Sequence, residues 1–241
     1  MYYSAAVPPE EATRLVKARQ ILTLIRKHCS GRDVSEMVLL DYGASTGLMT
    51  AFFAEHFRRV VGVDVDRPAL DIAAQRFRNA NLSFQPIDSE RTTFAADSFD
   101  VVIANQVYNC VENQGDMFAE IHRVLKPGGF CFLGARNKYA LIESQYRLPL
   151  LSMLPGGVAK LYLRAFRNTS TFAGHRYLSH ARLMKLAAPF KVHDYTLEIL
   201  RRPADFGFDS LTGIAPLARI LPLEWIVGLI PNYIMILERR G

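Results

Sequence analysis

The chain has 241 residues, of which 50% are hydrophobic, and a formal net charge of +6. This length and composition allow one full hydrophobic core, which excludes a low-complexity chain and a small disulfide-stabilised protein. Cys29, Cys110 and Cys131 have no C-x-x-C or histidine-rich spacing, so we expect no structural zinc, no other metal site and a reducing, cytoplasmic compartment. The first residues lack the basic and apolar regions of a signal peptide.

The predicted elements alternate between helices and strands over the first 135 residues. Apolar residues at helical spacing predict an amphipathic helix over 10–28, and a short apolar run predicts a strand over 37–41. Such alternation is typical of an α/β protein with a doubly wound, mostly parallel sheet. The elements that follow are a helix over 46–56, a strand over 59–64, a helix over 67–79, strands near 82–86 and 99–104, a helix over 115–125 and a strand over 129–135.

The alternation ends after residue 135. Residues 136–180 are interpreted as a helical cap insertion and 181–188 as a short helix. Phe190 to Leu200 and Asn232 to Arg239 are expected to be strands, with an apolar insertion rich in Pro and Gly over 203–230. We therefore expect a single domain over 1–241, made of a core over 1–135, a cap over 136–180 and a C-terminal part over 181–241.

Three of the predicted strands end in an acid: Asp41, Asp64 and Asp88. The first acid opens the glycine-rich turn Asp41-Tyr42-Gly43-Ala44-Ser45-Thr46-Gly47. Because parallel strands end at the same edge of a sheet, these carboxylates are expected along the edge where open α/β sheets bind ligands.

The pattern Asp-x-Gly-x-x-x-Gly at 41–47, followed by Leu-Lys-Pro-Gly-Gly at 125–129, resembles the class I S-adenosylmethionine-dependent methyltransferases. The similarity covers roughly residues 35–135 and is to the type 11, ubiquinone-biosynthesis-like group. It implies a seven-stranded Rossmann-like fold with an antiparallel terminal hairpin, and S-adenosylmethionine as the cofactor. Ser45 stands where the commonest turn of this family has glycine, and we expect it as a tolerated variant with a negative φ.

The resemblance also implies a cofactor site. Asp64 would accept hydrogen bonds from the ribose hydroxyls, Asp88 would hold the adenine, and Asp41 would face the methionine end. An alternative for each acid is a helix N-cap or a turn. The predicted cofactor contacts are Asp41, Gly43, Ala44, Gly47, Asp64, Val65, Ile87, Asp88 and Asn105.

Candidates for a catalytic base come from the cap region. They are Glu143, Tyr146 and His175, for each of which a structural role is the alternative. The segment 137–149 resembles that of bacterial methyltransferases acting on sugars or lipid-linked glycans, where Glu-x-His-Tyr is frequent. Gln145 replaces the histidine of that pattern, which removes one candidate base.

Basic residues are concentrated in 136–202, which holds 12 Lys and Arg against 3 Asp and Glu. This excess indicates either a solvated basic face or a surface that meets phosphates of a substrate or a lipid layer. A nucleic-acid partner is not expected, because dense basic runs with stacking aromatics are missing.

Two segments bear on membrane contact. The segment 158–167 predicts a basic amphipathic helix, which either packs as a cap or lies on an anionic membrane. The apolar segment 211–230 contains Arg219, Glu224 and two prolines, so we do not expect it to span a bilayer. Burial in the cap or at an interface is preferred for this segment, with peripheral membrane contact second.

Three functions remain open. The first is transfer of a methyl group to a small-molecule, sugar or lipid-linked acceptor, expected to be anionic. The second is an inactive S-adenosylmethionine-binding module acting through protein partners, which Ser45 and Gln145 suggest. The third is a nicotinamide oxidoreductase, against which stands the missing Gly-x-Gly-x-x-Gly turn.

Overall fold

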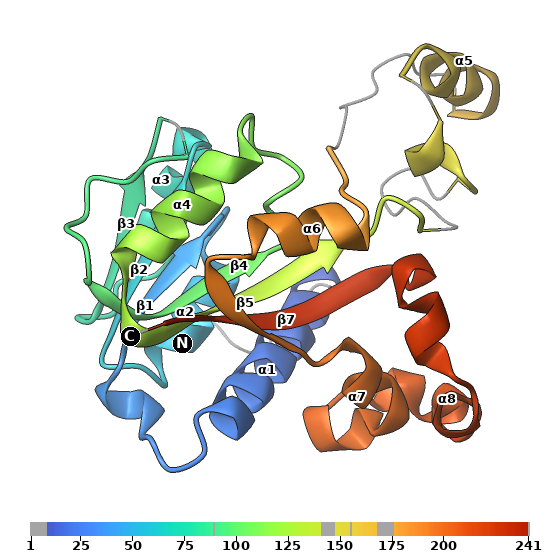
Figure 1. Ribbon diagram of the computed structural model, residues 1–241. Helices are drawn as coiled ribbons and strands as arrows, with labels where there is room; N and C mark the ends of the chain where they lie inside the picture. The colour runs from blue at the N-terminus through green and yellow to red at the C-terminus, as the bar shows by residue number, and fades with distance from the viewer. Residues whose placement is uncertain (1–8, 89, 141–147, 155, 168–175, 241) are drawn as a thin grey trace.

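The computed structural model describes residues 9–88, 90–140, 148–154, 156–167 and 176–240. At its centre is a seven-stranded sheet with the order β3-β2-β1-β4-β5-β7-β6 (Figure 1). Strands β1 to β5 are parallel, and β7 is antiparallel to both of its neighbours, which confirms the predicted fold class. The strands are β1 (Val38–Tyr42), β2 (Arg59–Asp64), β3 (Leu82–Pro86), β4 (Phe99–Asn105), β5 (Leu125–Arg136), β6 (Phe190–Asp194) and β7 (Asn232–Arg239).

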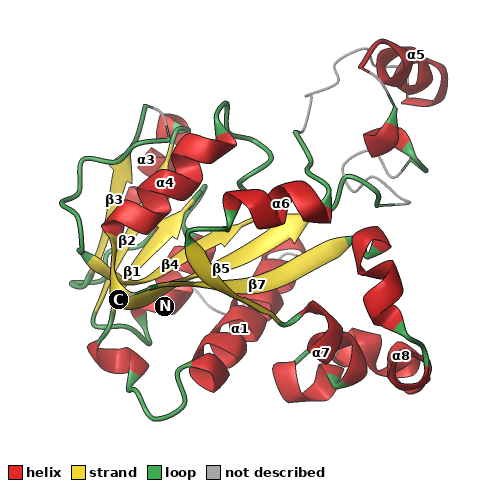
Figure 2. Cartoon of the chain, viewed as in Figure 1, coloured by secondary structure: helices red, strands yellow, loops and turns green. Residues whose placement is uncertain are grey.

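Helices cover both faces of this sheet (Figure 2). The described α-helices are α1 (Pro9–His28), α2 (Leu48–Ala54), α3 (Arg67–Arg76), α4 (Gln114–Val124), α5 (Gly156–Arg167), α6 (His180–Leu186), α7 (Thr196–Arg201) and α8 (Ala215–Ile220). One core joins α1 and α2 to the sheet through Phe53 and Phe130, and a second joins α4 and α6 through Met117 and Leu183. Strand β5 serves both cores, because successive residues of a strand point to opposite faces.

Several predicted boundaries were wrong, among them the end of the helix predicted over 67–79, which lies at Arg76. Strand β6 ends at Asp194, because the carboxylate of Asp194 accepts a hydrogen bond from the backbone N–H of Thr196 at 2.9 Å and α7 starts there. Helix α2 begins at Leu48, since Gly47 before it has a φ of +76°. Strand β5 begins at Leu125 with a register shift against β4 between Phe99 and Val101, so the Lys-Pro-Gly-Gly segment lies within the strand.

The connection between β6 and β7 is built from α7, α8 and three short 3-10 helices, η3 (Pro203–Phe206), η4 (Asp209–Ile214) and η5 (Leu223–Leu229). Burial in the cap, one of the two arrangements preferred for the apolar segment 211–230, was wrong for most of its large side chains, since Trp225 is 88% exposed; burial at an interface stays a prediction. The exposed ones, which we call the C-terminal apolar surface, are Ile214, Leu217, Ile220, Leu221, Trp225, Ile226 and Leu229.

Helix α5 lies apart from the sheet in Figure 1. It buries Ala159 and Leu163 in a small separate cluster, while Val158, Leu161 and Phe166 of its predicted apolar face are exposed. In the described part of the chain, no helix is both long and apolar enough to cross a membrane. The division into core, cap and C-terminal part stays a proposal.

Candidate functional site

The glycine-rich turn after β1 is held in left-handed backbone conformations. Gly43 has a φ of +94°, and its N–H donates to the carbonyl of Val63 at 2.8 Å. Gly47 has a φ of +76°, and a Cβ there would lie 2.6 Å from the Cβ of Ala73. Glycine is the residue that adopts this backbone without strain, and at Gly43 the place of a Cβ is taken by Val107 at 2.9 Å. Both glycines therefore let the turn at the end of β1 pack closely on neighbouring side chains.

Ser45, in the middle of this turn, contradicts one expectation. Its φ is +50°, not negative, so a non-glycine residue occupies the left-handed region. Such a conformation costs roughly 1–2 kcal/mol for a residue with a Cβ. The backbone N–H of Ser45 donates to Oδ2 of Asp64 at 2.7 Å. This hydrogen bond to a charged acceptor offsets part of the strain. It holds Ser45 in the left-handed conformation that glycine adopts readily.

Asp64 ends β2 and is fixed between two elements. Its Oδ2 accepts from Ser45, and its Oδ1 accepts from the N–H of Asp66 at 3.0 Å, just before α3. A carboxylate has about four lone-pair positions, so each oxygen keeps acceptor capacity. This is the geometry needed to accept hydrogen bonds from two neighbouring hydroxyls of a ligand.

Asp41 is the buried acid of the site, with 5% exposure. Thr50 of α2 donates its hydroxyl to Oδ2 of Asp41 at 2.6 Å. Burial raises the pKa of Asp41 to about 6; the Thr50 hydrogen bond lowers it and the negative charge of Asp64 raises it further. A cation bound nearby would stabilise the ionised form of this carboxyl.

The other predicted cofactor contacts differ in exposure. Ile87 is buried in the core and its N–H donates to the carbonyl of Asp64 at 3.0 Å, while Val65 is exposed. The side chain of Asp88 is 84% exposed and forms an ion pair with Arg67 at 2.6 Å. Ala44 is buried, and its N–H donates to the carbonyl of Val63 at 3.0 Å. The cofactor roles of all these residues stay predictions.

A cavity of about 650 Å³ lies at the carboxyl ends of β4 and β5. Of the nine predicted cofactor contacts, Asn105 at the end of β4 alone lines it, so the cavity does not include the glycine turn. The described lining residues include Lys17 and Arg136 but no carboxylate. Its apolar walls come mainly from α1, α7 and η4 with their neighbouring residues, and include Ile21, Leu24, Ile199, Leu200, Phe208 and Leu211.

Among the lining residues that were not predicted from the sequence are Lys17, Gln106 and Arg136. Gln106 follows β4 with a φ of +61°, and its N–H donates to the carbonyl of Gly134 at 2.8 Å. Its place directly after a predicted strand was an available signal, as was the place of Arg136 at the end of another. Lys17 lies on the helix before the first strand, where no local motif marks it. Loss of hydration, and then repulsion from Arg14 and Arg136, lower the pKa of the Lys17 ammonium.

Glu143, Tyr146 and His175, the predicted catalytic residues, lie outside the described residues. Their roles therefore remain predictions. No histidine or carboxylate is found among the described residues that line the cavity.

Comparison with known proteins identifies the fold family. Residues 40–133 match the family model described as "Methyltransferase domain". The chain is 29% identical over 165 residues to a ubiquinone/menaquinone biosynthesis C-methyltransferase of Desulfotalea psychrophila, covering 64% of this chain and 66% of the relative. It is 27% identical over 152 residues to a ubiquinone biosynthesis O-methyltransferase of Coxiella burnetii, covering 60% and 59%. The matched part is thus less than two thirds of either relative.

Among solved structures, the chain resembles the plantazolicin methyltransferase crystallised with a substrate analogue and S-adenosylhomocysteine. The TM-score is 0.62 at 17% identity, over 97% of this chain and 86% of that one. This likeness supports the fold, and the sequence matches support the family over the nicotinamide oxidoreductases. Residues 40–133 thus carry a methyltransferase domain, and the chain is similar to S-adenosylmethionine-dependent methyltransferases of ubiquinone biosynthesis, in line with the resemblance to the class I group.

Proposed function

We propose that this protein transfers a methyl group from S-adenosylmethionine to an acceptor with an apolar body and an anionic group. The observation that carries this proposal is the cavity beside Asn105, with its largely apolar lining, its cations Lys17 and Arg136, and no carboxylate among the described lining residues. Bound S-adenosylmethionine supplies a methyl group activated by a positive sulfonium. The protein's contribution is then to align the acceptor with it.

The strand ends fit this cofactor. Gly43 and Gly47 hold the turn in a left-handed backbone packed closely on Val107, Ala73 and Phe84, and Asp64 keeps acceptor capacity for two ribose hydroxyls. Asp41 offers a buried carboxyl whose ionised form would be stabilised by the positive charges of the methionine part. In this proposal Ile87 and Asp88 border the adenine, and Asn105 lies between the cofactor and the acceptor cavity.

The cavity favours an acceptor of two chemical parts. Its apolar walls favour a lipid-linked or otherwise apolar molecule over a free sugar. Loss of hydration lowers the pKa of Lys17 first, and repulsion from Arg14 and then from Arg136 adds to this, so an anionic group beside Lys17 and Arg136 would stabilise the charged ammonium. The names of the two curated relatives, which concern quinone biosynthesis, support an acceptor with an apolar part.

We further propose that the protein works as a cytoplasmic enzyme in peripheral contact with an anionic membrane. The C-terminal apolar surface and the exposed apolar side chains of α5 support this, as does the basic excess of 136–202. Vesicles with acidic lipid should bind the protein better than neutral ones, and salt should weaken the binding. Reversal of Lys160 and Arg164 to Glu should remove the preference. Equal binding to neutral vesicles would contradict this part of the proposal.

The base, where the acceptor atom needs one, is proposed among Glu143, Tyr146 and His175. The single variants are Glu143→Gln, Tyr146→Phe and His175→Gln. Loss of a general base should lower kcat by about 10²–10⁴-fold while the affinity for S-adenosylhomocysteine stays unchanged. Three variants with unchanged kcat would exclude all three residues as the base.

The test of the main proposal measures formation of S-adenosylhomocysteine with paired acceptors that share an apolar chain and differ in an anionic or neutral head. Lys17→Ala and Arg136→Ala should each raise KM for the anionic acceptor by about tenfold or more. Arg14→Ala is the matched control, because Arg14 lies near Lys17 and does not line the cavity. A preference for neutral acceptors would overturn the anionic part. Cofactor binding without turnover of any acceptor would favour the inactive binding module.

A further inference from the structure

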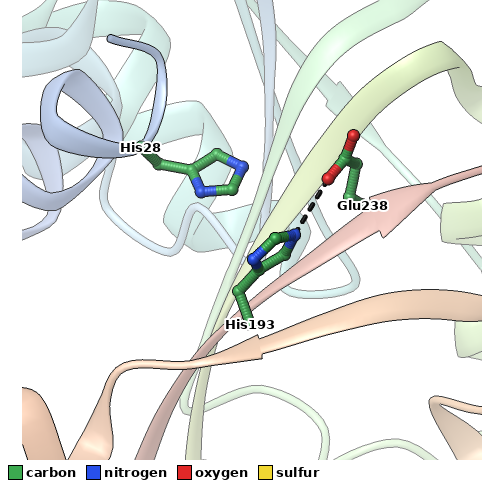
Figure 3. A group of neighbouring side chains, drawn as sticks. All are labelled: His28, His193 and Glu238. Carbon is green, nitrogen blue, oxygen red and sulfur yellow. Dashed lines mark hydrogen bonds and ion pairs between the residues drawn. The ribbon is translucent and has the colours of Figure 1, made fainter.

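Two histidines and one glutamate meet far from the proposed acceptor cavity. His28 is the last residue of α1, His193 lies on β6 and Glu238 on β7 (Figure 3). One ligand atom of each side chain lies within 4.8 Å of the other two, and all three side chains are half-buried. Glu238 of β7 lies opposite Phe130 of β5 in the sheet. Arg136, at the end of β5 that borders the cavity, lies six residues further along that strand, about 20 Å away.

Hydrogen bonds already orient this group, which we call the histidine cluster. Nε2 of His193 lies 2.9 Å from Oε2 of Glu238, the contact drawn as a dashed line in Figure 3. Nδ1 of His28 lies 3.0 Å from the hydroxyl of Tyr195. In the tautomer whose Nδ1 donates to Tyr195, Nε2 of His28 carries the lone pair. This is how a second partner usually fixes a metal-binding histidine.

We propose that His28, His193 and Glu238 bind a zinc ion. Two imidazole nitrogens and one carboxylate oxygen form a usual zinc donor set, with water as the fourth ligand. Bond lengths of about 2.0–2.2 Å in a tetrahedral site place neighbouring ligand atoms about 3.3 Å apart. The pair of His193 and Glu238 is close to this spacing, and the ligand atom of His28, within 4.8 Å of both, would move closer on zinc binding.

A neighbouring positive charge allows a zinc site to be distinguished from a merely structural cluster. Nζ of Lys191 lies 3.6 Å from Oε2 of Glu238, and its side chain is largely exposed. The ammonium competes with a cation for the same carboxylate oxygen. Lys191→Ala should therefore tighten zinc binding, whereas a merely structural pair of His193 and Glu238 would give no zinc effect at all.

Zinc at this place would join the C-terminal end of α1 to the edge strand β6 and its neighbour β7. The same helix lines the cavity through Lys17, Ile21 and Leu24 on its earlier turns. The site would thus hold the helix without taking part in methyl transfer, and it does not depend on the proposed acceptor.

The experiment titrates the untagged full-length chain with Zn²⁺ against a chromophoric zinc indicator, and with Co²⁺ followed by its visible absorption. One equivalent should bind. His28→Gln and Glu238→Gln should each weaken binding at least about tenfold, and Lys191→Ala should tighten it. His56→Gln, a histidine outside the cluster, should leave it unchanged. A zinc concentration about 100 times Kd should raise the Tm of the wild-type protein by roughly 5–10 °C.

Circular dichroism and affinity for S-adenosylhomocysteine serve as folding controls for the variants. Absence of zinc binding by the wild-type protein would overturn the proposal, as would binding that survives His28→Gln together with His193→Gln. Should a histidine variant fail to fold, Lys191→Ala decides alone, because unchanged or weaker zinc affinity in that variant contradicts the site.

Discussion

The strand ends that face the proposed cofactor and the cavity that faces the proposed acceptor have opposite charges. Asp41, Asp64 and Asp88 place carboxylates along the first, whereas Lys17 and Arg136 supply cations to the second, with no carboxylate among its described lining residues. A cationic cofactor and an anionic acceptor would each be attracted to one region and repelled by the other. Charge complementarity of this kind contributes more to the specificity for a ligand than to the affinity.

The two regions also differ in construction. The turn at 43–47 presents backbone, held by hydrogen bonds from Gly43 and Ala44 to Val63 and from Ser45 to Asp64. The cavity presents side chains from helices far apart in the sequence. Substitutions in the turn should therefore change stability and cofactor affinity, while substitutions in the cavity should change the choice of acceptor. The following predictions test the cofactor side of this comparison.

The largest effect is expected at Gly47. Gly47→Ala would place a Cβ 2.6 Å from that of Ala73 in a left-handed backbone, at a combined cost of about 2–4 kcal/mol. Thermal unfolding should show a decrease in Tm of about 5–15 °C. Gly128→Ala is the matched control, because Gly128 has a φ of +73° with nothing within 4 Å of an added Cβ. Equal losses in both variants would show that crowding at Gly47 does not matter.

Asp64→Ala should weaken S-adenosylmethionine strongly. Two hydrogen bonds to a charged acceptor are worth roughly 1.5–3 kcal/mol, which is about a ten- to hundredfold change in Kd. Calorimetric titration measures this. Asp71→Ala, at an exposed acid of α3, provides the control. Unchanged affinity in Asp64→Ala would remove Asp64 from the cofactor site.

Asp41→Asn should separate stability from cofactor binding. Burial raises the pKa of Asp41 from 3.8 to about 6, so its contribution to stability is complete below pH 3.8 and is lost as the pH rises through 6. At pH 7 the Asn variant should be more stable than wild type by about 3 kcal/mol, and near pH 3.8 the difference should almost vanish. Denaturant unfolding at several pH values checks this.

The same carboxyl should make cofactor binding depend on pH. A cation near Asp41 favours its ionised form, so the affinity of wild type for S-adenosylmethionine should fall as the pH drops below about 6. The Asn variant should bind more weakly at pH 7 and without this dependence. A parallel pH profile in both proteins would mean that Asp41 does not face the cofactor.

The smallest effect is expected at Ser45. Ser45→Gly relieves a φ of +50° and loses some of that gain to the greater freedom of glycine in the unfolded chain. We expect an increase of up to about 1 kcal/mol in the free energy of unfolding, with cofactor affinity equal or tighter. Loss of affinity in this variant would show that the hydroxyl makes a necessary contact.

Sequence periodicity predicted the parallel part of the sheet well because its elements are local. Strands β1, β2 and β4 are mostly apolar, and the end of each strand from β1 to β5 is marked by an acid, an amide or a glycine within a few residues. The failures have local causes that the pattern does not encode. Asp194 ends β6 by accepting a hydrogen bond from Thr196, so the segment that was predicted as a strand up to Leu200 becomes a helix.

Sequence reasoning finds candidate residues only where a local pattern marks them. Asp41, Asp64 and Asn105 each lie at or next to the end of a strand, so they come together at one edge of the sheet. Lys17 and Arg136 lie 119 positions apart in the sequence and meet at the cavity because α1 packs across the end of β5. The histidine cluster is assembled from three elements in the same way, and no spacing in the sequence announces it.

The connection from Tyr195 to Pro231 leaves the sheet at β6 and returns beside it at β7. The N–H of Tyr195 donates to the carbonyl of Ile234 at 3.0 Å, so the two ends of this connection are neighbours. It supplies the cavity wall at Ile199 and Leu211, yet most of the sheet forms without it. The connection can therefore be exchanged as one unit between related chains, with Ile199 and Phe206 kept. We expect such an exchange to change the acceptor preference and to leave the proposed cofactor site unaltered.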